Sequence, residues 1–329
     1  MAKLQLSLAC ANYDRVRALL DGRTPIDGVD IVPTILEPSE AFHRAFKYQE
    51  FDITELSLSS HTMVTSRGNS AYVGVPVFPS RVFRHSGIYV RTDRIKRPED
   101  LRGKRVGVPE YQITANVWIR GILLEEYGVK PEEVKWRRGG IGDPGRDERT
   151  PLKLPPTIDL QPLPAGKTLS GMLEAGELDA VISARALPCF MRGAPDVGRL
   201  FADYRTIEED YFRRTGIFPI MHLIGIRKSL VEKHPWLPVN VYKAFLHAKA
   251  IAVQDLNIIG HLMVTLPWVV HEYNAVKALM GDDYWPYGLA ANEKQLETFT
   301  RYHHEQGLSA QKVAARDLFA PSTLDLSKT

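Results

Sequence analysis

Polar and charged side chains follow several apolar runs of this chain, at the points where those runs pass into loops. In α/β proteins, ligands gather at the carboxyl ends of strands and at the N-termini of helices. Loops of this kind are therefore where binding and catalytic side chains are expected. Five segments fit the description: residues 12–15, 57–61, 79–85, 110–114 and 183–185.

Three arginines in these loops are candidates for binding an anionic ligand. A guanidinium group presents a planar fork of N–H donors that matches a carboxylate with two hydrogen bonds. Arg81, Arg84 and Arg185 are the best placed for this role. The alternative for each is an ordinary surface salt bridge, which contributes little to stability.

Four further residues in the same loops are candidates for polar contacts with a ligand: Asn12, Tyr13, Ser59 and Thr114. The hydroxyl of Tyr13 suits a phenolic partner, and simple packing is its alternative. Thr114 stands at the start of a predicted helix, so its alternative role is to cap that helix.

Two histidines and two glutamates are candidates for general acid–base chemistry. His222 and His85 come first, because the unperturbed pKa of histidine lies near neutrality. Each lies in a segment where the chain is expected to cross between domains. Glu55 and Glu110 lie at strand or loop positions where a buried carboxylate can exchange a proton. A structural histidine and a solvated glutamate are the alternatives.

Motifs for metals, disulfides and organic cofactors are missing from the sequence. Cys10 and Cys189 stand in neither a CxxC nor a zinc spacing, which favours two buried free thiols. The pairs His303–His304 and His271–Glu272 do not form an HExxH motif, and we expect the first pair to be exposed. No glycine-rich phosphate loop or Schiff-base motif is present, so no organic cofactor is predicted.

Composition places the chain among ordinary globular proteins. It has 329 residues, of which 44% are hydrophobic and 25% charged, and a net charge of only +3. Acidic and basic residues are interspersed, which argues against a nucleic-acid partner. The sequence shows neither a secretory signal nor an apolar run long enough for a membrane span. A cytoplasmic protein with a small-molecule partner is expected.

Apolar periodicity predicts an alternating α/β order that occurs twice along the chain. Strands are predicted at residues 4–9, 51–58, 105–108 and 178–183, with helices at 14–20, 39–48 (N-cap Ser39), 114–127 and 169–175. Crossing strands are predicted at 82–90 and 218–226, and helices at 239–256 and 294–306.

The repeated plan predicts two lobes rather than one sheet. The first lobe is expected to contain residues 1–88 and 222–329, with a helical C-terminal region, and the second residues 89–221. Residues 137–167 are rich in Gly, Pro and charge and predict a long loop, as a lid, an arm or a partner contact. A mobile surface loop is the alternative.

Two motifs resemble the type II periplasmic-binding-protein fold. They are LRGKRVGVP at residues 101–109, followed by a predicted helix, and MLEAGELDAV at residues 172–181. The resemblance implies a two-lobed α/β protein with a central ligand cleft.

Four other segments resemble the 4,5-dihydroxyphthalate decarboxylase family over nearly the whole chain: GIFPIMH (216–222), HPW (234–236), DYWPYG (283–288) and LFAPST (318–323). The resemblance implies a cytosolic enzyme that forms a homo-oligomer and converts 4,5-dihydroxyphthalate to protocatechuate and carbon dioxide. Such chemistry needs a proton donor over the ring carbon, a group that stabilises the phenolate and cations for the retained carboxylate. A divalent metal ion chelated by the catechol oxygens is compatible with this chemistry, and the sequence does not decide whether one is used.

Two other functions use the same fold. One is a cytosolic solute-binding or ligand-sensing protein for an aromatic carboxylate, which binds without turnover. The other is a relative that makes a pyrimidine precursor, but the histidine- and cysteine-rich motif expected for it is not evident in this sequence.

Overall fold

The computed structural model describes residues 3–145, 148 and 151–326. The chain forms two compact units. The first contains the described residues up to Arg81, residues 220–297 and those from Val313 onward, and the second contains residues 82–219 and 298–312. The chain passes from the first unit to the second after Arg81 and returns after Pro219, whereas these crossings were expected after residues 88 and 221. Residues 298–312 group with the second unit, although they were expected in the first.

A five-stranded sheet forms the centre of the first unit, in the order β2-β1-β3-β11-β4. Strands β1, β2 and β3 are parallel, whereas β11 is antiparallel to both β3 and β4. The strands are β1 (Leu4–Cys10), β2 (Val29–Ile35), β3 (Ile53–Ser57), β4 (Tyr72–Arg81) and β11 (Ile220–Arg227). Because β11 comes from late in the chain and lies between β3 and β4, the unit closes only after the chain returns from the second unit.

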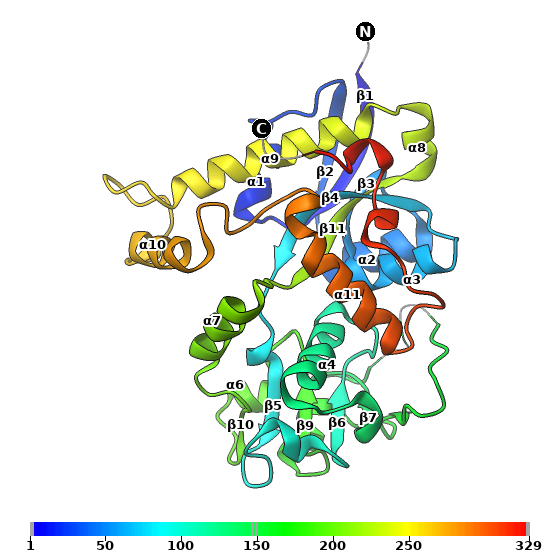
Figure 1. Cartoon of the computed structure of the whole chain (residues 1–329), viewed down its shortest axis with the longest axis vertical. Helices are drawn as coiled ribbons and strands as arrows, with labels where there is room; N and C mark the ends of the chain where they lie inside the picture. The colour runs from blue at the N-terminus through cyan, green and yellow to red at the C-terminus, as the bar shows by residue number, and fades with distance from the viewer. Residues whose placement is uncertain (1–2, 146–147, 149–150, 327–329) are drawn as a thin grey trace. The chain divides into compact units, whose positions relative to one another are not determined.

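Helices pack against the sheet of the first unit, and the part of this unit that follows β11 is mainly helical. Helix α1 packs against α9, α2 against β3, and α9 also contacts β4 (Figure 1). The helices are α1 (Asp14–Leu20), α2 (Pro38–Tyr48), α3 (Leu58–Ser66), α8 (Lys228–Lys233), α9 (Leu237–Asp255) and α10 (Val269–Met280). Helix α11 (Glu293–Glu305) begins in this unit and ends in the second. The predicted helical C-terminal region is confirmed.

A six-stranded mixed sheet forms the second unit, in the order β10-β5-β9-β6-β7-β8. Its strands are β5 (Ile88–Arg91), β6 (Arg105–Val108), β7 (Lys135–Arg138), β8 (Leu160–Pro162), β9 (Ala180–Ile182) and β10 (Val197–Arg199). Its helices are α4 (Thr114–Tyr127), α5 (Leu169–Glu174), α6 (Pro188–Met191) and α7 (Tyr204–Thr215). None of the helices in the described ranges is long and apolar enough to span a bilayer.

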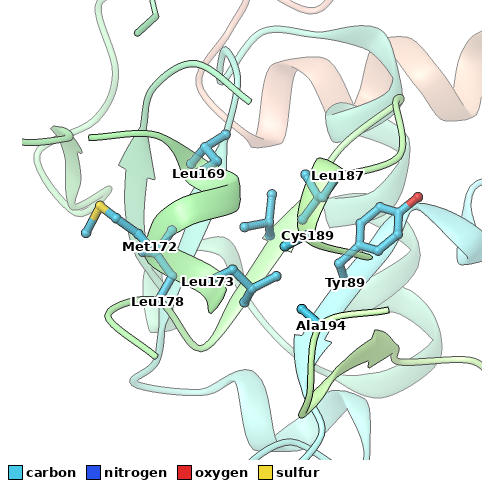
Figure 2. Close-up of a cluster of buried hydrophobic side chains, with 9 residues drawn as sticks. Tyr89, Leu169, Met172, Leu173, Leu178, Leu187, Cys189 and Ala194 are labelled. Atoms are coloured by element: carbon cyan, nitrogen blue, oxygen red, sulfur yellow. The ribbon is translucent and has the colours of Figure 1, made fainter. Parts of the chain in front are cut away.

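Buried apolar side chains of α5, β5, β9 and α6 form one core cluster of the second unit, shown in Figure 2. Gly107, the second glycine of the 101–109 motif, borders this cluster. A Cβ atom at Gly107 would lie 2.5 Å from the Leu169 side chain and 3.0 Å from those of Leu178 and Val181. Real Cβ contacts are not this short, so close packing of α5 on β6 requires glycine there.

Several predicted elements differ from the structure at their ends. Helix α2 begins at Pro38, so Ser39 is not its N-cap, because proline with its fixed φ favours the first helical position. The strand predicted to reach Leu58 ends at Ser57, whose side chain accepts a hydrogen bond from the backbone of Ser60 and caps α3.

Two predicted segments have a different structure. The strand predicted at 82–90 is wrong in its first half, since β4 ends at Arg81, a short 3-10 helix (His85–Gly87) follows, and β5 begins only at Ile88. The loop predicted at 137–167 contains β8, which pairs in parallel with β7. Strand β2 was not predicted. It contains Pro33, which has no N–H to donate in a sheet and therefore argues against a strand, but β2 is an edge strand, where proline is tolerated.

Candidate active site

Glu55 and His222 lie on neighbouring strands whose register brings their side chains together. In the antiparallel pair of β3 and β11, Ile224 is opposite Glu55 and His222 is opposite Ser57. Because side chains alternate between the faces of a strand, His222 and Ile224 share the face of Glu55. His222 is thus the diagonal neighbour of Glu55, within reach of a long side chain. Its Nδ1 atom lies 2.6 Å from Oε1 of Glu55.

The carboxylate of Glu55 is fully buried and surrounded by donors. Oε1 also accepts a hydrogen bond of 2.8 Å from the hydroxyl of Tyr13. Oε2 accepts the backbone N–H of Ala11 at 3.1 Å and lies 3.4 Å from the sulfur of Cys10. A buried charge is tolerated when it is paired and hydrogen-bonded in this way.

These donors determine the protonation of the cluster. Burial by itself raises the pKa of a carboxyl group, but the hydrogen bond and charge of His222, with the bonds from Tyr13 and Ala11, hold the pKa of Glu55 below its ordinary value. Burial, reinforced by the negative charge of Glu55, raises the pKa of the Cys10 thiol and of the Tyr13 hydroxyl. Glu55 is therefore an ionised acceptor, and Cys10 and Tyr13 remain protonated donors.

The ring of His222 is the most accessible part of this pair. Its side chain is 17% exposed, against 0% for Glu55. Phe42 contacts the ring edge to face, with the centroids 4.8 Å apart. With Nδ1 bonded to Glu55, the other ring nitrogen, Nε2, has no hydrogen-bond partner among the described residues. It is the nitrogen through which the pair can exchange a proton with a ligand.

Arg15 joins the cluster through Tyr13, whose hydroxyl bonds Glu55 and whose ring contacts Arg15. Its guanidinium carbon lies 4.3 Å from the centroid of the Tyr13 ring and 4.3 Å from that of Trp285. Its Nε donates a hydrogen bond of 2.6 Å to the backbone carbonyl of Pro79, and its Nη1 bonds Asp14 at 2.9 Å. The cation thus contacts two aromatic rings, and its hydrogen bonds to Pro79 and Asp14 fix its position.

A second set of bonds holds Trp285 in place. Its indole N–H donates to the carbonyl of Phe78 at 2.9 Å, and its own carbonyl accepts from the buried Lys249 at 2.8 Å. Arg81 donates to the next carbonyl, that of Pro286, at 2.9 Å and also bonds the side chain of Asn292. The Trp285 ring that contacts Arg15 is therefore held against the sheet by hydrogen bonds.

Among the residues predicted for the site, His222, Glu55 and Tyr13 form one hydrogen-bonded group in the first unit. Asn12 is exposed beside Tyr13, and its side-chain oxygen accepts a 3.5 Å hydrogen bond from Arg17. Ser59 is buried in the first turn of α3. Three of the predicted residues are thus shown to contact one another directly.

Arg81, also in the first unit, has another environment than the one expected of a ligand-binding arginine. It is only 3% exposed, and burial lowers its pKa to about 9. Its bonds to Pro286 and Asn292 join the end of β4 to the segment that contains Trp285. In the structure, Arg81 therefore helps to hold the segment that contains Trp285.

The remaining predicted residues belong to the second unit. His85 is buried against Phe201 and Tyr211, and its backbone N–H bonds Glu208 at 3.1 Å. Burial lowers the pKa of the neighbouring Arg84 to about 10, with Glu208 acting against that shift. His85 thus packs as an aromatic side chain within its own unit.

Glu110, Thr114 and Arg185 also belong to the second unit. Glu110 is buried, and its backbone carbonyl accepts a hydrogen bond from the side chain of Asn116. The N-cap of α4 is Ile113, so the expected capping role of Thr114 is wrong; Thr114 is the first helical residue. Arg185 is exposed after β9, with its backbone N–H bonded to Ser183.

The described part of the chain contains no group of three or more His, Cys, Asp or Glu side chains placed to hold a metal ion. Both cysteines are free and buried, as predicted. His304 is exposed, but His303 is fully buried against Phe299 on the apolar face of α11, so the predicted exposed pair is wrong for His303.

Three residues of the cluster were not predicted for it: Cys10, Arg15 and Trp285. The sequence places Arg15 in the loop that contains Tyr13 and Trp285 in the DYWPYG segment. Nothing in the local pattern says that these two segments meet, because they are separated by most of the chain.

Comparison with known proteins gives two curated relatives. A 4,5-dihydroxyphthalate decarboxylase from Comamonas testosteroni is 49% identical over 329 residues, which is 100% of both chains. A 4,5-dihydroxyphthalate decarboxylase from Pseudomonas putida is 51% identical over 214 residues, covering 65% of this chain and 83% of the relative. No protein-family model matches this sequence.

Solved structures support the fold. The periplasmic aliphatic sulphonate binding protein from Escherichia coli aligns with a TM-score of 0.53 and 16% identity, over 99% of this chain and 100% of its own. A Candida albicans protein described as having the generic periplasmic binding protein fold aligns with a TM-score of 0.50 and 12% identity, over 100% and 99% of the two chains. The predicted fold class, a periplasmic-binding-protein-like α/β fold, is confirmed.

Proposed function

This chain belongs to the 4,5-dihydroxyphthalate decarboxylase family, and we propose that it converts 4,5-dihydroxyphthalate to protocatechuate and carbon dioxide, with His222 as the proton donor. The enzyme is a carbon–carbon lyase. Identity of 49% along the entire chain carries the assignment of the activity. The Glu55–His222 pair supports the assignment of the proton donor.

The reaction replaces a carboxylate on the ring with a proton. Direct loss of carbon dioxide would leave a carbanion on the aromatic ring, so the ring carbon is protonated first. The hydroxyl para to the departing carboxylate donates electrons to the ring and makes that protonation feasible. The Nε2–H of protonated His222 gives its proton to the carbon, and a C–H bond forms. The C–C bond then breaks, its electron pair restores the aromatic ring, and carbon dioxide leaves.

Glu55 and Tyr13 prepare His222 for this step. The ionised carboxylate of Glu55 accepts the Nδ1–H, which orients the ring and leaves Nε2 as the acid. Tyr13 and the backbone of Ala11 hold the carboxylate in place. After proton transfer the neutral imidazole takes a new proton from solvent, and the cycle is complete.

A turnover assay tests the proposal. Purified protein is incubated with 4,5-dihydroxyphthalate, and carbon dioxide and protocatechuate are measured together. In D₂O, deuterium is expected at the ring carbon that carried the lost carboxylate, because the proton comes from an exchangeable group. Saturable binding without either product would reject decarboxylation and leave a binding protein.

We also propose that the protein works in the reducing environment of the cytoplasm and associates with further copies of itself. Two free buried thiols fit a reducing compartment. The connection between α9 and α10 can be followed in Figure 1. Its exposed apolar side chains offer a contact surface: Ile259, Leu262, Met263, Leu266 and Trp268. Light scattering coupled to size-exclusion chromatography checks the second part; a monomer at all concentrations would reject it.

A further inference from the structure

The guanidinium of Arg15 is fixed in a way that leaves part of it available. Its carbon lies over the rings of Tyr13 and Trp285, 4.3 Å from each centroid. These contacts use the ring faces and leave the N–H bonds of the guanidinium as the groups that can bind another partner. The side chain of Arg15 is 18% exposed, so it is not sealed inside the core.

The hydrogen bonds of Arg15 account for two of its three nitrogens. Nε donates to the carbonyl of Pro79, and Nη1 donates to Asp14. Nη2 has no hydrogen-bond partner among the residues that the structure describes. A guanidinium has five N–H donors in a fixed plane, and the bidentate partner that best fits two of them is a carboxylate.

The position of Arg15 relates it to the proton-transfer group. The Tyr13 ring contacts the guanidinium with its face and Glu55 with its hydroxyl, and Glu55 in turn bonds His222. The charge of Arg15 is close enough to lower the pKa of Tyr13 and Cys10 against the larger effects of burial and Glu55. Arg15 and the proton-donating group are therefore joined by one series of contacts within the first unit.

We propose that Arg15 binds a carboxylate of the aromatic substrate and so determines specificity for ring carboxylates. This inference rests on the proposed function, since it names the anchor of the same site. It transfers the role expected for Arg81 to Arg15. Arg81 is buried and bonded to Pro286 and Asn292, whereas Arg15 is partly exposed and pre-organised by stacking, which lowers the cost of binding.

Calorimetric titration with phthalate, which has the two carboxylates but no hydroxyl groups, tests the anchor without requiring turnover. Arg15→Met keeps an unbranched side chain for packing but removes the charge and the donors. We expect its Kd for phthalate to rise at least tenfold, about the effect of one charge-assisted hydrogen bond. Arg15→Lys, which keeps the charge but not the fork, should lie between Arg15→Met and the wild type.

Arg17→Met is the matched control, because Arg17 lies on the same helix and is exposed; its Kd should equal that of the wild type. With 4,5-dihydroxyphthalate, Arg15→Met should raise KM more than it lowers kcat. A residue that acted only by supporting Tyr13 would instead lower kcat.

The inference is overturned if Arg15→Met and Arg15→Lys, with the thermal midpoint of the wild type, bind phthalate as tightly as the wild type does, or if the wild type does not bind phthalate at all. Should Arg15→Met fail to fold, Arg15→Lys alone decides. A wild type that binds phthalate but does not decarboxylate 4,5-dihydroxyphthalate refutes the proposed function and leaves the anchor standing.

Discussion

Tyr13 and His222 hydrogen-bond the same oxygen, Oε1 of Glu55, at 2.8 and 2.6 Å. Tyr13 follows β1 and His222 lies on β11, so two separate strands deliver donors to one buried carboxylate. The two hydrogen bonds lower the pKa of Glu55 and keep its carboxylate ionised, although burial alone would raise that pKa. The bond from His222 also fixes which nitrogen of its ring can act on a ligand.

Removal of the imidazole should stop proton transfer. We expect His222→Ala to lower kcat about 100- to 10,000-fold, the usual contribution of a general acid, while phthalate binding changes little. Steady-state kinetics with 4,5-dihydroxyphthalate, beside calorimetry with phthalate, measures both. An unchanged kcat would remove His222 from the mechanism.

Replacement of the carboxylate should have a smaller effect that depends on His222. Glu55→Gln keeps the shape but loses a charge-assisted hydrogen bond, so kcat should fall about 10- to 100-fold. In the His222→Ala background the same change should cost much less, because the carboxylate acts through the ring. Additive effects in this double-mutant cycle would contradict the proposed coupling.

Loss of the Tyr13 hydroxyl should shift the pH profile. Tyr13→Phe removes one donor from Glu55 and thereby raises the pKa of that carboxyl, since this hydrogen bond helps to lower it. Activity should then disappear at a higher pH on the acidic side than it does in the wild type. The acid limb of kcat, followed from neutral pH to below the ordinary carboxyl pKa of 4.5, checks this; a limb at the same position would argue that Tyr13 only packs.

His61 should make the protein less stable in mild acid. Burial, helped by the charge of Lys228, lowers the pKa of His61 from 6.5 to about 4, and its Nε2 bonds the carbonyl of Leu318 at 2.9 Å. The folded protein holds this ring neutral while the unfolded chain protonates it. The contribution to stability is therefore complete above pH 6.5 and is lost as the pH falls toward 4.

The expected loss from this residue between pH 7 and pH 4.5 is about 2 to 3 kcal/mol. Urea titrations at the two pH values give the free energy of unfolding of the wild type and of His61→Gln. The variant should lose less stability in acid, even if it is less stable at neutral pH. Equal losses in the two proteins would show that other groups cause the acid sensitivity.

Gly107→Ala should destabilise the second unit. The added methyl group would lie 2.5 Å from the side chain of Leu169, and overpacking of this kind costs about 1 to 3 kcal/mol. Gly260→Ala is the control, because a Cβ there meets no atom within 4 Å. If both substitutions lowered the midpoint temperature of thermal unfolding equally, the packing argument would be contradicted.

Much of the local structure follows from the sequence alone. Helices α1 and α4 and strand β6 have the predicted bounds, because apolar periodicity and the glycine after α4 act over a few residues. The same holds for the fold class, which depends on short motifs, and for the selection of His222, Glu55 and Tyr13 as candidates. Element ends were less predictable where a proline or a side-chain cap decided them, as at Pro38 and Ser57.

Only the tertiary structure decided which candidates meet. Glu55 and His222 are 167 residues apart, and the register of β3 against β11 determines that they are diagonal neighbours. A shift of one residue would turn His222 to the opposite face of the sheet. Arg15 and Trp285 likewise come together only when the sheet of the first unit is complete. The sequence by itself therefore determined the chemical groups and the elements that carry them, whereas long-range strand register, which no local pattern encodes, selected the pairs.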